Sequence, residues 1–182
     1  MVLLILGVAL WWAAHLFKRV APERRAAMGE KGAAPVAIAI VLAIVLMVIG
    51  YRSWASPHIW FPQLWLTHVN NTLMILSVLL FGMASTSGRL RGKLRHPMLM
   101  GFGTWCLAHL LVNGDLASII LWGGLWAWAI TEVKVINAKE PNWDRPEPGT
   151  AKGDVKLVVI SLAVFGVITA IHGWIGPSPF PV

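Results

Sequence analysis

Histidine is the residue type in this sequence whose placement most strongly suggests chemistry. Four of the six histidines lie inside long apolar runs: His15, His68, His109 and His172. Ionisable side chains are costly inside apolar spans and usually face the interior of a helix bundle. Neutral imidazole is the commonest protein ligand for transition metals, and it also binds haem iron. The embedded histidines therefore predict a haem or metal site between helices, with interhelical hydrogen bonds as the structural alternative.

The elements that must position these histidines are apolar runs long enough to cross a membrane, which takes about 20 residues. Hydrophobic residues make up 57% of the 182-residue chain and charged residues only 13%, whereas a soluble domain is roughly 25% charged. The six runs are Val2–Phe17, Ala33–Gly50, Leu64–Ala84, Pro97–Val112, Leu116–Thr131 and Val155–Ile175. We therefore predict an all-α fold, an integral membrane bundle of about six transmembrane helices that forms a single domain over residues 1–182.

Two connections between the runs have a recognisable character. Asn113-Gly114-Asp115 joins the fourth and fifth runs, and Asn and Gly suit a turn while Asp115 can cap the next helix. We expect a tight helical hairpin at this point. The segment Glu140–Gly153 is polar and rich in proline, so it is expected to be the longest irregular stretch.

The basic residues indicate how the runs are oriented. The formal net charge is +7, and fourteen of the fifteen Lys and Arg residues fall on one side of a six-span arrangement, with Arg52 as the exception. The positive-inside rule makes that side cytoplasmic. We expect a cell inner membrane protein with both termini periplasmic and with the lipid bilayer as its surroundings. No Lys or Arg stripe follows a helix, so we expect no nucleic-acid partner.

The N-terminus and the cysteine content narrow the possibilities further. The first apolar run starts at Val2, and Lys18 and Arg19 follow it, which is the reverse of a cleavable signal peptide. The single cysteine, Cys106, lies in an apolar run, so neither an intrachain disulfide nor a cysteine-based zinc site can form.

Depth in the bilayer separates the embedded histidines. At about 1.5 Å per residue, His68 lies roughly 6 Å, His172 about 5 Å and His109 about 12 Å below the outer interface. His15 lies about 20 Å from the outer face by the same rise. Depth alone therefore pairs His109 with His68 or His172. Helix tilt could instead bring His15 and His109 to one level.

Arg95-His96-Pro97 opens the fourth run. Proline at the first helical position leaves no N–H unpaired. Arg95 and His96 could bind a phosphate headgroup or a cofactor carboxylate. The structural alternative is a basic anchor at the cytoplasmic start of a helix.

Several segments together carry a resemblance to a known family. They are the opening run with His15, then Leu66-Thr67-His68-Val69-Asn70-Asn71-Thr72-Leu73-Met74, Arg95-His96-Pro97-Met98-Leu99-Met100-Gly101, Trp105-Cys106-Leu107-Ala108-His109 running on to Asp115-Leu116-Ala117-Ser118, and His172-Gly173-Trp174. They resemble the NnrU family of bacterial membrane proteins over nearly the whole chain. The resemblance implies a genetic link to nitric oxide and nitrite metabolism, and so to denitrification.

The NnrU family is related to zeta-carotene isomerase, a membrane haem b protein with a similar Trp-Cys-x-Ala-His stretch. This relation implies haem b as the cofactor, with His109 or Cys106 and the first-helix His15 as iron ligands. It also implies a hydrophobic small-molecule substrate and a haem-dependent cis-trans isomerase as one function, although it does not say that this chain acts on a carotenoid. The resemblance favours His15 with His109, whereas depth favours His68 or His172. We place His15 and His109 first as metal ligands, because the depth estimate assumes straight, untilted helices.

Two other functions stay open. Arg-His-Pro before a hydrophobic hairpin is also similar to membrane S-adenosylmethionine-dependent methyltransferases of the isoprenylcysteine carboxyl methyltransferase kind. Those enzymes have a Glu pair after the hairpin, and only Glu132 is present here. The other alternative is a non-catalytic accessory or sensor protein. The sequence specifies neither the substrate nor the oligomeric state.

Overall fold

The computed structural model describes residues 1–180, and this part of the chain is helical, with two isolated β-bridges and no β-strand. Within it, five helical segments are long and apolar enough to cross a membrane: α1 (Val2–Val20), α3 (Ala33–Arg52), α4 (Leu66–Met83), the continuous segment Leu116–Lys139, and α8 (Ala151–Ile175). A sixth apolar helix, α5 (Pro97–Val112), is shorter. The predicted all-α bundle of about six membrane helices is confirmed.

Short helical elements complete the chain. Helix α2 (Pro22–Ala27) and the 3-10 turn η1 (Glu30–Gly32) lie between α1 and α3, and the 3-10 turn η2 (Arg89–Gly92) precedes α5. The continuous fifth segment consists of α6 (Leu116–Ser118), the π-helical turn η3 (Ile119–Gly123) and α7 (Gly124–Lys139).

Four helices extend beyond the apolar runs that the sequence shows, α1 and α3 by two or three residues and the other two by more. The fifth segment continues from Thr131 to Lys139, and α8 begins at Ala151 instead of Val155. Thr150 caps α8, because its Oγ1 accepts a hydrogen bond from the backbone N–H of Gly153 at 3.1 Å. Helices continue into the polar interface because backbone hydrogen bonds and caps still stabilise them there. The irregular stretch therefore ends three residues earlier than predicted.

Asp115 caps the fifth segment as the sequence predicts. Its Oδ1 accepts a hydrogen bond from the backbone N–H of Ser118 at 3.0 Å. The connection from α5 is only three residues long, since α5 ends at Val112 and α6 begins at Leu116.

The chain divides into two compact units, which are described separately. The first unit comprises residues 1–60 and 114–141, and the second comprises residues 61–113 and 142–182, of which 181–182 lie outside the described residues. Helix α5 belongs to the second unit and α7 to the first. The hairpin pairing of these helices and the single domain over residues 1–182 therefore stay predictions.

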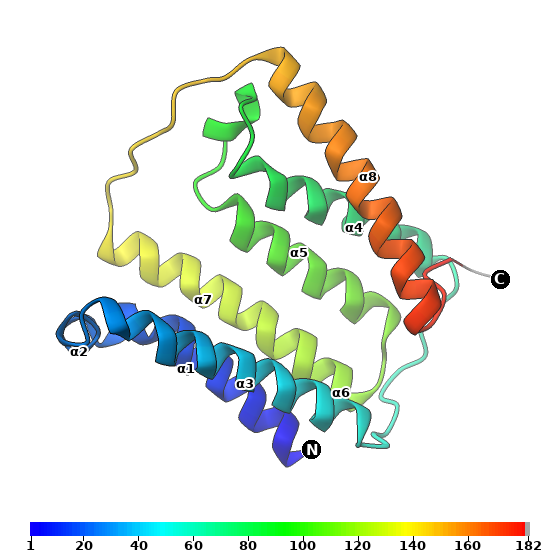
Figure 1. Cartoon of the computed structure of the whole chain (residues 1–182). Coiled ribbons are helices and arrows are strands. Elements are labelled where there is room, and N and C mark those ends of the chain that lie inside the picture. Colours follow the sequence, from blue (N-terminus) through cyan, green and yellow to red (C-terminus); the bar gives the residue numbers. More distant parts are fainter. Residues whose placement is uncertain (181–182) are drawn as a thin grey trace. The chain divides into compact units, whose positions relative to one another are not determined.

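In the first unit, glycine allows α1 and α3 to pack closely side by side (Figure 1). A Cβ on Gly7 would lie 2.7 Å from the backbone nitrogen of Met47, and a Cβ on Gly50 would lie 2.8 Å from the Cα of Leu4. Small residues at such positions are the usual way in which membrane helices approach each other. Because the start of α1 meets the end of α3, the two helices are antiparallel.

Helix α7 runs parallel to α1 in the same unit. The indole Nε1 of Trp12 donates a hydrogen bond to the carbonyl oxygen of Gly124 at 3.0 Å. Further along both helices, Arg19 lies opposite Glu132. Parallel packing is what the first and fifth spans of an alternating bundle require.

In the second unit, α4 packs against both other long helices. The Oγ of Ser77 donates a hydrogen bond to the carbonyl oxygen of Gly101 on α5 at 2.8 Å. Leu80 and Met83 form a buried cluster with Leu157 on α8. The end of α4 meets the beginning of α8, so these two helices are antiparallel.

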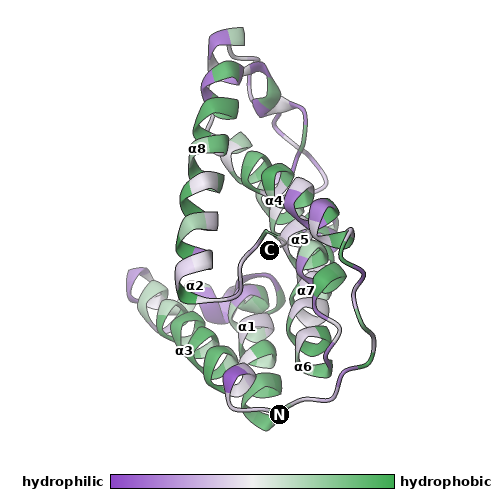
Figure 2. Ribbon diagram, turned by 90° about the vertical axis from the view of Figure 1, so that its right-hand side faces the viewer, coloured by the Kyte–Doolittle hydropathy of each residue, from purple (hydrophilic) through white to green (hydrophobic). Residues whose placement is uncertain are grey.

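The exposed surface of these helices is apolar. Ile38 and Val41 on α3 are 67% and 61% exposed, and Val159 on α8 is 60% exposed, whereas the polar side chains of Ser77 and Ser118 are buried. Figure 2 shows hydrophobic residues along the helices and hydrophilic residues mainly at helix ends and loops. Such surfaces suit contact with a lipid bilayer.

Candidate functional site

The second unit brings His109 of α5 close to His172 of α8. Their ring centroids are 6.5 Å apart, and the ring planes are inclined by 29°. His109 lies in the last turn of α5 and His172 in the last turn of α8. Both rings therefore sit at the same end of two helices that run in the same direction, as the depth estimate requires.

A hydrogen bond holds the His172 ring in the orientation and tautomer of a metal-coordinating histidine. Its Nδ1 lies 2.9 Å from the carbonyl oxygen of Pro177, which can only accept, so Nδ1 carries the proton. The lone pair is then on Nε2. Ligating histidines almost always donate their second ring N–H to a carbonyl or carboxylate in this manner. The segment that supplies the carbonyl is itself held, since Asn71 donates to the carbonyl oxygen of Pro179 at 2.9 Å.

The surroundings of His109 are aromatic and tightly packed. The Trp105 ring contacts the His109 ring edge-on at a centroid distance of 5.7 Å. Cys106, on the adjacent face of α5, has no exposed surface. The amide of Asn113 donates to the carbonyl oxygen of His109 at 2.8 Å, which fixes the end of the helix next to the ring.

His15 lies in the first unit between two indole rings. Its ring centroid is 4.1 Å from that of Trp11 and 4.7 Å from that of Trp128. Its Nδ1 lies 2.9 Å from the carbonyl oxygen of Trp11, so Nδ1 again donates and Nε2 carries the lone pair. His15 and His109 belong to different units. Their pairing as ligands therefore stays a prediction.

The remaining predicted site residues make no ring contact with these histidines among the contacts of the described residues. His68 is exposed on α4. His96 is the N-cap residue of α5, and its carbonyl oxygen accepts from the backbone N–H of Met100 at 3.0 Å. Arg95 donates from Nη2 to the carbonyl oxygen of Asn142 at 3.5 Å. The structure does not test a ligand role for any of them.

Sequence reasoning missed an ion pair in the first unit. Glu132 is only 8% exposed, and its Oε1 lies 4.0 Å from Nε of Arg19, which also pairs with Glu140. The other carboxylate oxygen, Oε2, is buried without a hydrogen-bond partner. The sequence feature that could have indicated it is the position of Arg19, four residues after His15 and on the same face of α1, where it would need a partner inside the bundle.

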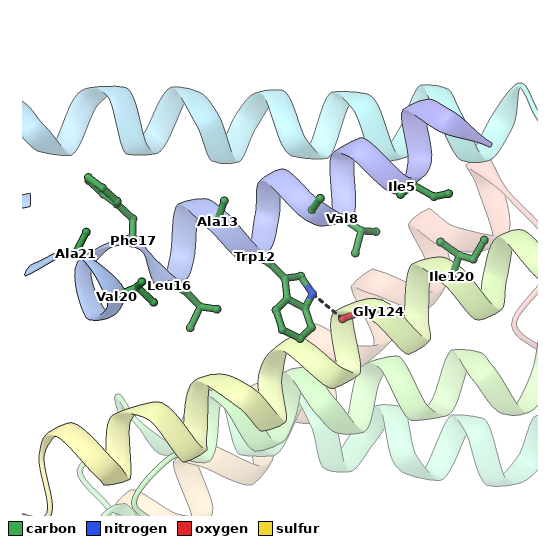
Figure 3. Close-up of a pocket in the computed structure, with 11 residues that line it drawn as sticks. Ile5, Val8, Trp12, Ala13, Leu16, Phe17, Val20, Ala21, Ile120 and Gly124 are labelled. Atoms are coloured by element: carbon green, nitrogen blue, oxygen red, sulfur yellow. Dashed lines mark hydrogen bonds between the residues drawn. The ribbon is translucent and has the colours of Figure 1, made fainter. Parts of the chain in front are cut away.

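The first unit also has an apolar groove of about 800 Å³ along α1. Ile5, Val8, Ala9, Trp12, Ala13, Leu16, Phe17, Val20, Ala21, Ile120 and Gly124 line it. Figure 3 shows Trp12 reaching across this groove to the carbonyl oxygen of Gly124. Among these lining residues, Trp12 has the polar side-chain group, and its indole is bonded to Gly124.

Comparison with known proteins decides the family. A family model described as NnrU protein matches residues 3–179. The chain belongs to the NnrU family. The match of this NnrU-family chain includes every histidine discussed above and all six apolar helices. No curated protein and no solved structure matches it.

The histidine chemistry of this NnrU-family chain suits haem. The His109 and His172 rings lie 6.5 Å apart in one unit, so two imidazoles from neighbouring helices are available there as ligands. Among residues 1–180 no three His, Cys, Asp or Glu residues are grouped as a metal site. Haem needs only one or two protein ligands, since its porphyrin supplies the other four nitrogens.

Proposed function

We propose that this protein is a multi-pass inner-membrane haem b protein of the NnrU family, in which His109 and His172 would hold the haem iron. Its role would lie in nitric oxide or nitrite metabolism. The observation that carries the proposal is the 6.5 Å separation of the two imidazole rings within one compact unit. The resemblance named above supplies the cofactor and the link to denitrification.

Each residue near the pair has a definite part in this proposal. The carbonyl of Pro177 sets the tautomer of His172, so that the lone pair on Nε2 would be available to hold a metal. Trp105 packs edge-on against His109 and limits rotation of its ring. Haem, when bound, would supply the iron chemistry that nitric oxide or nitrite metabolism requires. The apolar helices around the pair would exclude water from it.

The membrane orientation belongs to the same proposal. The basic loops would face the cytoplasm and both termini the periplasm. His109 and His172 would then lie toward the periplasmic side, because α5 and α8 both end there. A gaseous or apolar ligand could reach this side from the bilayer or from the periplasm.

Absorption spectra of the full-length protein test the proposal. Protein purified in mild detergent from cells supplied with a haem precursor should show a Soret band that shifts on reduction with dithionite. His109→Ala and His172→Ala should each abolish or shift the band, because loss of one ligand opens a coordination position or empties the site. His68→Ala is the matched control, since His68 is an exposed histidine of the same unit.

The spectra also separate this ligand pair from the pair that the resemblance favours. If His15→Ala removes the band and His172→Ala leaves it unchanged, the ligands are His15 and His109, and the assignment of His172 is wrong. A wild-type protein without any Soret band would sink the haem proposal. Nitric oxide added to the reduced protein should shift the band, and an unchanged spectrum would remove the nitric oxide role.

A further inference from the structure

A second groove lies in the second unit between α4 and α8, with a volume of about 590 Å³. Its wall is apolar and its mouth is polar. The wall is formed by Val78, Phe81, Gly82, Leu157, Ile160, Ser161 and Val164, and the mouth by Ser85, Thr86, Ser87 and Lys156. The polar mouth is at the end where α4 finishes and α8 begins. The groove is therefore amphipathic along the direction in which the helices cross the membrane.

Small residues keep the helices close beside the groove. A Cβ on Gly82 would lie 2.6 Å from Cδ1 of Leu157, and Ser161 is only 3% exposed. On the open side, Ile160 and Val164 are 49% and 39% exposed. From Lys156 to Val164 the wall extends about 12 Å at about 1.5 Å per residue. One leaflet of the hydrocarbon core is about 15 Å thick, so the wall could contact most of the length of one acyl chain.

The mouth of the groove is held in place by the first turn of α8. Thr86 Oγ1 donates to the carbonyl oxygen of Gly153 at 3.2 Å and accepts from the N–H of Gly88 at 3.1 Å. The N–H of Thr150 donates to the carbonyl oxygen of Ser87 at 3.0 Å. The loop that carries the serine hydroxyls is thus fixed beside Lys156 before any ligand binds.

The two segments that flank the mouth carry an excess of positive charge. Residues 85–96 and 150–156 contain six basic residues and one acidic residue, Asp154. Oδ1 of Asp154 accepts a hydrogen bond from the backbone N–H of Leu90 at 3.0 Å, so this carboxylate stabilises the loop before α5. Lys156 makes no ion pair with any other residue in the described part of the chain. An anionic group is the complement of this mouth.

We propose that this groove binds an anionic phospholipid from the leaflet on the side of the basic loops. The phosphate would pair with Lys156 and accept hydrogen bonds from Ser85 and Ser87, while one acyl chain lies along Ile160 and Val164. Basic pockets between membrane helices on the cytoplasmic side are known to take such headgroups. The proposal is independent of haem binding, since it rests on residues of the groove and not on His109 or His172.

Lipid retention by the full-length protein tests this inference. Protein stripped of lipid in detergent would be mixed with phosphatidylglycerol or phosphatidylcholine, and native mass spectrometry would measure the lipid that stays bound. Phosphatidylglycerol should be retained in preference. Lys156→Gln should weaken its retention about fivefold, the usual worth of one basic residue beside anionic lipid. Lys152→Gln removes the same charge from an exposed position outside the groove and should have little effect.

A second pair of variants tests the acyl-chain wall. Ile160→Trp should fill the groove and lower retention, whereas Val159→Trp, on the neighbouring face of α8, should not. If Ile160→Trp fails to fold, the lysine pair decides the outcome. Equal retention of the two lipids, or equal loss in Lys152→Gln and Lys156→Gln, would overturn the proposal. So would inorganic phosphate that raises the melting temperature as much as phosphatidylglycerol does, because the acyl chain would then contribute nothing.

Discussion

Arg19 and Glu132 face each other across the contact between α1 and α7, with Nε of Arg19 4.0 Å from Oε1 of Glu132. Arg19 also pairs with Glu140, so one guanidinium serves two carboxylates. The Glu132 side chain is 10% exposed and that of Glu140 is 55% exposed. The arginine therefore matters chiefly for the buried carboxylate, which water cannot stabilise.

Removal of Arg19 is expected to destabilise the protein more than removal of the charge on Glu132. Arg19→Met should cost about 1–3 kcal/mol, less than the ~3–5 kcal/mol of a fully buried pair because the pair is long and Arg19 is partly exposed. Glu132→Gln should cost less, and adding it to Arg19→Met should recover stability. Unfolding can be followed with a thiol-reactive dye, since Cys106 is the only cysteine and is fully buried. Additive losses in the double variant would contradict the pairing.

Asp115 should make stability depend on acidity. Partial burial raises the pKa of this carboxyl, but hydrogen bonds from Ser118 and Ser56 outweigh burial and hold the pKa below its usual value of 3.8. A group whose pKa is lowered by folding stabilises the fold above its unfolded pKa and loses that effect as the pH falls through the folded pKa. The contribution should therefore be complete at neutral pH, begin to fall as the pH drops to about 4, and disappear only below the folded pKa.

Substitution of Asp115 checks the same cap at neutral pH. Asp115→Ala should cost about 1–2 kcal/mol, since it removes an N-cap and leaves the N–H of Ser118 without its acceptor. Asp144→Ala in the exposed loop should cost nothing measurable and serves as the control. A loss of stability in acid that is the same in Asp115→Ala and in the wild type would assign the pH effect to other groups.

Gly50 should not tolerate even alanine. A methyl group there would lie 2.8 Å from the Cα of Leu4, and backbone atoms cannot move aside as a flexible side chain can. Gly50→Ala is therefore expected to separate α1 from α3 and to lower the melting temperature sharply. Gly166→Ala on α8 is the matched control, because no atom lies within 4 Å of its added Cβ. It should be neutral or stabilising by up to about 1 kcal/mol from helix propensity.

Fusions at the chain ends test the orientation. A phosphatase fused to the C-terminus should be active and a fluorescent protein fused there should be dark, because both report a periplasmic end. The same two reporters in the loop that contains Lys93 should give the opposite pattern. The C-terminal residue, Val182, lies outside the described residues, so the fusions locate a part of the chain that the structure does not describe. A fluorescent C-terminal fusion would show that the C-terminus is cytoplasmic, and would exclude an arrangement of six spans with the basic loops in the cytoplasm.

The sequence by itself determined the membrane helices and several of their ends. The length of an apolar run can be read directly from the sequence, and a run that matches the thickness of the bilayer is expected to form a membrane helix. All six runs are helical in the structure. Asp115 is a cap because side-chain and backbone atoms only three residues apart satisfy each other. Such local hydrogen bonds need no knowledge of the rest of the fold. Where a helix continues into the polar interface, as from Thr131 to Lys139, its residues are no longer apolar, so hydrophobicity alone did not predict where it ends.

Only the tertiary structure decided which faces of the helices meet. The sequence left His15, His68 and His172 as possible partners for His109, with His15 first, and packing within the second unit puts His172 beside it. The pairing of Arg19 with Glu132 and the amphipathic groove at Lys156 were equally hidden. An apolar helix is attracted to lipid over its whole surface, so hydrophobicity does not fix its rotation. Close packing at small residues such as Gly50 does.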